Sequence, residues 1–99
     1  MNDRHSYDID PLWRHLVGDL LRRARLERGE TLADVARRAG VSVQYLSEIE
    51  RGRKDPSSEM LSAVLGALGW SLLDLASGVA DDLRSATVPL SRGAVALAA

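Results

Sequence analysis

Polar side chains gather on one short stretch in the middle of the chain, where Gln44 is followed by Ser47 and Glu48 three and four residues later. Residues at this spacing share one face of a helix. The Gln44 amide donates and accepts in one plane, which matches the N6/N7 edge of adenine, and Val43 can lie against a thymine methyl group. Ser47 can contact a base or a phosphate. Chemistry of this kind predicts a surface that reads DNA bases.

Two residues of this stretch are open to more than one interpretation. Glu48 can accept a hydrogen bond from cytosine N4, pair with Arg51, or stay solvated. Tyr45 either packs on the edge of the core or reaches the DNA backbone. We therefore include Glu48 among the candidate base readers and Tyr45 among the candidate backbone contacts.

Phosphate-binding chemistry surrounds the same stretch. Thr31 and Ser42 are good N-cap residues, and backbone N–H groups at a helix start favour anions. Behind the stretch, Arg51, Arg53 and Lys54 form a basic loop. Such cations supply the salt-sensitive, sequence-independent part of DNA affinity.

Charge is unevenly distributed along the chain, although the net charge is only −1. Residues 12–54 hold ten Arg or Lys against six Asp or Glu, whereas residues 1–11 carry −2 and residues 55–99 carry −3. The positive excess lies on the half that would face phosphates. A mixed, solvated surface is the alternative interpretation of the same count.

The composition argues against several other classes of protein. A chain of 99 residues makes one domain with a modest core, and the absence of cysteine excludes disulfides and thiolate chemistry. No apolar run approaches the roughly 18 residues of a membrane span, and the polar, acidic start is not a signal peptide, so a cytoplasmic protein is expected. His5 and His15 are the only histidines. Without a nucleophile or metal constellation, we expect no enzyme, no cofactor and no metal.

Two short helices joined at a glycine must position these side chains. They lie in TLADVARRAGVSVQYLSEIERGRK, residues 31–54. Ala36 is small, Gly40 follows four residues later, and Leu46 and Ile49 stand six and nine positions after the glycine. This spacing is that of a helix-turn-helix, in which one helix enters the major groove. An ordinary hairpin of core helices is the alternative.

The periodicity of the whole chain predicts an all-α fold with five helices. Capping residues and glycines delimit them. We expect a domain over residues 12–84, with flexible segments at 1–11 and 85–99. The helices are expected at about residues 12–28, 32–39, 43–50, 58–68 and 72–83.

Several segments together resemble the Cro/CI-type, or XRE-family, DNA-binding domains, which have a lambda-repressor-like fold. They are LRRARLERGETL (21–32), YLSEIERGRKDPSSEML (45–61) and ALGWSLLDL (67–75). VSVQYLSEIERGRKDPSSE (41–59) is most similar to the subgroup that regulates Clp protease genes. Trp70 departs from the family, which usually has a smaller aliphatic residue there.

The resemblance implies a transcriptional regulator and an ion pair between Arg25 and Glu50. One domain covers few base pairs, so we expect a homodimer on a palindromic operator of Clp protease or proteostasis genes. The fifth helix is the candidate interface, unless its apolar face only closes the monomer core. The candidate interface residues are Trp70, Leu72, Leu73, Leu75, Ala76 and Val79.

The end of the chain, Ala96, Leu97, Ala98 and Ala99, resembles the ending of the tag that sends stalled-translation products to Clp-type proteases. We therefore expect a C-terminal degron and a Clp-type protease as a second partner. An antitoxin or protein-binding adaptor with the same fold is the alternative function.

Overall fold

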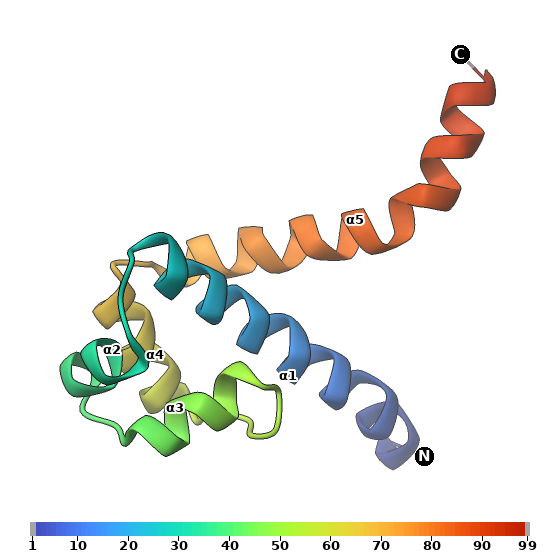
Figure 1. Ribbon diagram of the computed structural model, residues 1–99. Helices are drawn as coiled ribbons and strands as arrows, with labels where there is room; N and C mark the ends of the chain where they lie inside the picture. The colour runs from blue at the N-terminus through green and yellow to red at the C-terminus, as the bar shows by residue number, and fades with distance from the viewer. Residues whose placement is uncertain (1, 99) are drawn as a thin grey trace.

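The protein is described by a computed structural model, which covers the backbone of residues 2–98 and the side chains of residues 11–85. Within that part of the chain the fold is all-α, as predicted, with five helices and no strand. Figure 1 shows the three short helices α2, α3 and α4 gathered at the C-terminal half of α1. The helices are α1 (Asn2–Glu27), α2 (Leu32–Ala39), α3 (Val43–Glu50), α4 (Ser58–Leu68) and α5 (Leu72–Ala98).

Local capping determines where the short helices begin and end. The Thr31 hydroxyl accepts from the Asp34 N–H, and the Asp34 carboxylate accepts from the Thr31 N–H. Ser42 caps α3 through the Tyr45 N–H. Gly40 ends α2 in the left-handed conformation, at φ 74°, which glycine adopts without steric cost. These caps are local, so the predicted bounds of α2 and α3 agree with the structure.

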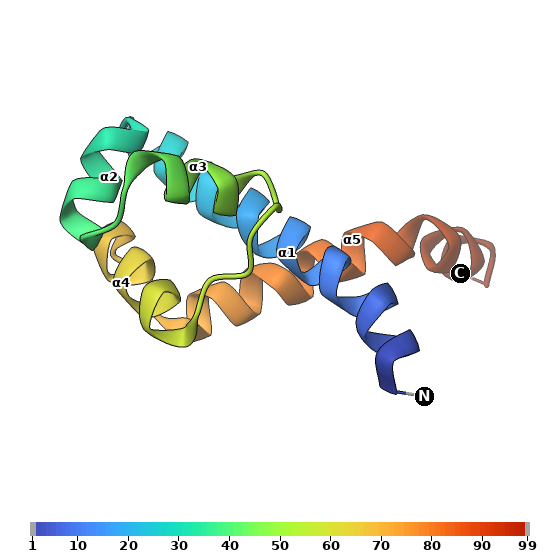
Figure 2. The ribbon, with the colours of Figure 1, turned by 90° about the horizontal axis from the view of Figure 1, so that it is seen from below.

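The core lies between α1 and the four other helices. Leu21, Leu46 and Ile49 are at most 1% exposed, so the inward positions predicted for α3 are confirmed. In Figure 2, α1 passes behind α3 and α5 lies beside α1. The remaining buried apolar side chains are Val17, Leu20, Ala24, Val35, Ala36, Val64, Leu65, Leu68, Leu75 and Val79.

Both ends of the chain differ from the sequence-based expectation. Proline has no N–H and favours the first turn of a helix, which is why Pro11 predicts a start near residue 12. Instead, α1 continues through Pro11 back to Asn2, and α5 runs to Ala98 with a bend in its second half (Figure 1). Proline costs a helix one hydrogen bond and bends it without necessarily ending it. The predicted degron, residues 96–99, lies outside the residues whose side chains are described.

Among the described residues, no single helix combines the length and hydropathy needed to cross a membrane. Only α4 taken together with residues 72–85 of α5 reaches that hydropathy, and these two helices meet at 93°.

Candidate nucleic-acid interface

The turn between α2 and α3 brings the predicted base-reading side chains to one surface. Val41 donates its N–H to the carbonyl of buried Ala36 at 3.0 Å, which closes the turn. With Leu46 buried, the start of α3 points outward. Val43 is 45% exposed and Gln44 is exposed as well.

Further along α3, Ser47 and Glu48 are partly exposed, and Glu48 has a partner. Its Oε1 lies 3.5 Å from Nζ of Lys54, which also stands 5.6 Å from the centroid of the Tyr45 ring. Tyr45 itself packs against the core. The structure therefore pairs Glu48 with Lys54, a partner that the sequence analysis did not consider, and Tyr45 lies at the core edge, which was one of its two expected positions.

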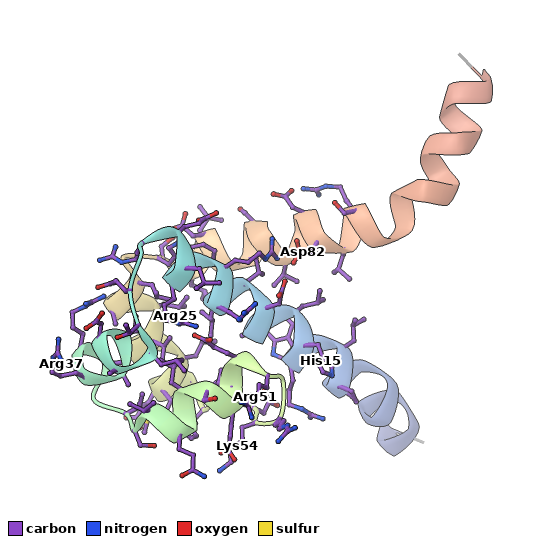
Figure 3. All side chains as sticks on the ribbon, in the orientation of Figure 1. His15, Arg25, Arg37, Arg51, Lys54 and Asp82 are labelled. Carbon is purple, nitrogen blue, oxygen red and sulfur yellow. The ribbon has the colours of Figure 1, made fainter. Side chains whose placement is uncertain are left out.

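The predicted phosphate contacts surround this surface. Arg51 and Arg53 are exposed on the loop after α3, and Figure 3 shows Arg51 and Lys54 near one end of α3. Arg37 lies at the opposite end of the α2–α3 unit with its side chain 74% exposed. Sequence reasoning missed this cation. At the start of α2, the Asp34 carboxylate already holds the Thr31 N–H, and this hydrogen bond is the main reason why the pKa of Asp34 is lowered.

A buried ion pair fixes the far end of α3. Arg25 donates from Nε and Nη2 to the two carboxylate oxygens of Glu50 at 2.8 and 2.9 Å. The side chains are only 10% and 5% exposed. The hydrogen bond to Glu50 raises the pKa of Arg25. Arg25 also donates Nη1 to the carbonyl of Glu30 at 2.9 Å, so one guanidinium joins α1, α3 and the α1–α2 loop.

Gly18 is a second positioning residue, and the sequence analysis did not single it out. A Cβ at this position would lie 2.3 Å from the carbonyl oxygen of Ile49 and 2.8 Å from that of Glu50. Helix α1 therefore approaches the last turn of α3 closely enough to exclude any side chain. The available signal was a glycine inside an otherwise strong helical pattern, which usually has a packing reason.

Glu30 joins α2 to α4 in a way that spacing does not reveal. Its carboxylate receives Arg28 Nε at 2.6 Å and Arg38 Nη1 at 2.5 Å. The same two guanidinium groups donate to the last carbonyls of α4, those of Leu68 at 3.2 Å and Ala67 at 2.7 Å. Hydrogen bonds from Arg38, and then from Arg28, lower the pKa of Glu30 to about 2.

This lowered pKa predicts an acid-dependent loss of stability. The unfolded chain takes up the Glu30 proton near the ordinary pKa of 4.5, so the contribution is complete above that pH and is lost as the pH falls toward 2. We expect the melting temperature of Glu30→Gln to lie below that of the wild type at neutral pH and to converge with it in acid. Glu27→Gln, which removes an exposed carboxylate of α1, is the matched control. A constant gap at every pH would contradict this role.

The predicted dimer residues fall into three groups by exposure. Leu72 and Leu73 are 68% and 73% exposed, and Ala76 is exposed beside them. Trp70 is half-buried against the core. Leu75 and Val79 belong to the core, at 1% and 8% exposure, so their assignment to an interface is corrected. A helix that is apolar on most sides does not reveal in its sequence which side faces inward.

No group of three or more His, Asp or Glu that could hold a metal occurs among the described residues. What the described surface offers instead is exposed hydrogen-bonding side chains on α3, flanked by cations.

Residues 21–75 match the helix-turn-helix family HTH_3, and they include α2, the turn and α3. The chain belongs to this helix-turn-helix family. This agrees with the XRE-type resemblance of the sequence, and the relatives of the chain are described as transcriptional regulators.

Known relatives of this family member include the transcriptional regulator ClgR of Mycobacterium tuberculosis, 61% identical over 57 residues, which are 58% of this chain and 51% of ClgR. The regulator SinR of Bacillus subtilis is 40% identical over 63 residues, covering 60% of this chain and 57% of SinR. The chain thus spans about half the length of these curated relatives.

A comparison with solved structures gives the same family. The clp gene regulator ClgR from Corynebacterium glutamicum superimposes with a TM-score of 0.69 at 43% identity, covering 80% of this chain and 86% of that one.

Proposed function

We propose that this helix-turn-helix regulator binds a palindromic operator as a homodimer and controls Clp protease genes. The observation that supports the DNA-reading role most strongly is the exposed start of α3 held on a scaffold by the buried Arg25–Glu50 pair. The target genes are inferred from the relatives, whose solved structures are described as clp gene regulators. Genome-wide mapping of bound sites is expected to place them upstream of genes for Clp subunits. Sites that avoid these promoters would overturn the proposed target.

In this proposal, Val43, Gln44 and Ser47 read base edges, because they lie at the exposed start and middle of α3. Arg51 and Arg53 bind phosphates from the following loop. The N-caps Thr31 and Ser42 bring backbone N–H groups to the same surface.

Replacing Gln44 and Arg53 separates the two kinds of contact. We expect Gln44→Ala to cost about 1–3 kcal/mol of discrimination at one base pair, because only the base edge loses a partner. Arg53→Ala should weaken specific and random duplexes alike and reduce the salt slope by about one counterion. Selection from randomised duplexes, followed by titration at several salt concentrations, measures both. Identical specificity profiles for the two variants would contradict the assignment.

Dimer formation through α5 would use the exposed pair Leu72 and Leu73, since Leu75 and Val79 are already buried in the monomer. We expect Leu72→Asp combined with Leu73→Asp to shift the protein to a monomer in sedimentation and to weaken operator binding. Leu26→Asp, on a half-exposed leucine of α1, is the matched control. A wild-type chain that sediments as a monomer at micromolar concentration would exclude this interface.

A further inference from the structure

Lys54, Tyr45 and Glu48, here named the Lys54 cluster, place a carboxylate on the face that reads DNA. Glu48 stands four residues after Gln44 and so shares its side of α3. A carboxylate there is repelled by phosphates unless a cation neutralises it. In this structure Lys54 is that cation, with its Nζ 3.5 Å from Glu48 Oε1.

The Lys54 cluster holds its lysine loosely. The ammonium–carboxylate distance of 3.5 Å is longer than that of a good charged hydrogen bond, and the two side chains are 51% and 31% exposed. The second partner is the Tyr45 ring, 5.6 Å from Nζ to the ring centroid. Exposed ion pairs and cation–π contacts of this kind are weak and sensitive to salt. A DNA phosphate can therefore draw Lys54 away.

We propose that Lys54 and Glu48 act as one specificity device. In the free protein Lys54 neutralises Glu48; on DNA the lysine moves to a phosphate and leaves the carboxylate facing the groove. Glu48 then needs a base-edge donor, and cytosine N4 is the donor with which carboxylates characteristically pair in the major groove. This inference rests on the proposed DNA-binding function. It adds Glu48 as a residue that gives specificity by disfavouring the wrong bases.

Rejection follows from the cost of leaving Glu48 without a partner. Where the facing base offers an acceptor, the released carboxylate meets neither Lys54 nor a donor, and an unpaired charge at an interface is costly. Where it meets cytosine, the lost ion pair is replaced. The contact of Lys54 with a DNA phosphate is thereby coupled to the reading of a base by Glu48.

The first experiment uses the fact that Lys54 is the only lysine of the chain. Reductive methylation with ¹³C-formaldehyde keeps the positive charge and labels only Lys54 and the terminal amine. In the free protein the Lys54 methyl signal is expected to be shifted by the ring current of Tyr45. Adding duplexes enriched from a randomised library should remove that shift, while the terminal amine serves as the internal control.

The second experiment compares two cation variants. Lys54→Gln removes one phosphate contact, but DNA then no longer has to break the Lys54–Glu48 pair, so we expect it to weaken binding to random duplexes less than Arg53→Gln does. Arg53→Gln is the matched control, because Arg53 lies next to Lys54 outside the cluster. Adding Glu48→Ala should improve binding by Arg53→Gln about as much as it improves binding by the wild type, and should improve Lys54→Gln less, because only in Lys54→Gln is the pair already absent.

Selection with Glu48→Ala completes the test. Preference for cytosine at one position should fall about tenfold while preference at the Gln44 position persists. If the wild type enriches a sequence but the Lys54 signal does not move, or Glu48→Ala improves both cation variants equally, the coupling is wrong and the DNA-binding function stands. If the wild type enriches no sequence, the proposed function itself fails.

Discussion

Replacing Gly18 with alanine is expected to destabilise the protein by roughly 1–3 kcal/mol and to displace helix α3. The new methyl group would lie 2.3 Å from the Ile49 carbonyl oxygen, and the obstacle is backbone rather than a side chain that can rotate away. Relief therefore requires α1 and α3 to separate. Since α3 carries the proposed base-reading residues, we expect DNA affinity to fall even at temperatures where Gly18→Ala remains folded.

Gly66→Ala is the matched control, because Gly66 is also a glycine inside a helix and a Cβ there meets nothing within 4 Å. Removing a helical glycine without a clash is expected to raise stability by up to about 1 kcal/mol. Chemical denaturation of both variants measures the contrast. Equal stability of Gly18→Ala and the wild type would mean that the two helices separate at no cost.

Removing Arg25 is the second large effect. Arg25→Ala leaves the carboxylate of Glu50, only 5% exposed, without its partner, and breaking a buried pair in this way costs about 3–5 kcal/mol. That is a large share of the stability of a domain of this size, typically 5–15 kcal/mol. We expect a fall in melting temperature of more than 10 °C, at about 4–8 °C per kcal/mol, and loss of operator binding.

Three variants show whether the ion pair itself is responsible. Arg22→Ala removes an exposed arginine from the same helix and is expected to change stability by no more than about 0.5 kcal/mol. Arg25→Lys keeps the charge but not the two parallel hydrogen bonds, so it should fall between the wild type and alanine. Combining Arg25→Ala with Glu50→Ala should restore part of the stability. An unchanged melting temperature and affinity in Arg25→Ala would contradict the role of the pair.

The sequence predicts the parts of this site that depend on neighbouring residues. The bounds of α2 and α3 follow from the caps Thr31 and Ser42 and from the turn at Gly40, all within a few residues of the helices they delimit. The inward positions Leu46 and Ile49 follow from the same local periodicity. The exposed positions Val43 and Gln44 are what remains on the other face.

Contacts between distant parts of the chain could not be predicted in the same way. Nothing near Gly18 in the sequence shows that the carbonyls of α3 will lie against it. The two guanidinium groups that bind Glu30 also reach the carbonyls at the end of α4, and the pairing of Glu48 with Lys54 depends on how the loop after α3 folds back. The pair Arg25–Glu50 was anticipated only through the resemblance to a family.

Helices α2 and α3 are attached to different parts of the scaffold. Helix α2 packs mainly on α4 and is held there by Arg38, whereas α3 packs mainly on α1 at Gly18 and Arg25. In the proposed complex, the angle at which α2 and α3 meet a duplex is therefore set by residues outside the proposed base-reading and phosphate-binding set. The outward face of α3 can be rewritten without changing that angle, so this architecture is suited to acquiring new target sequences by few substitutions.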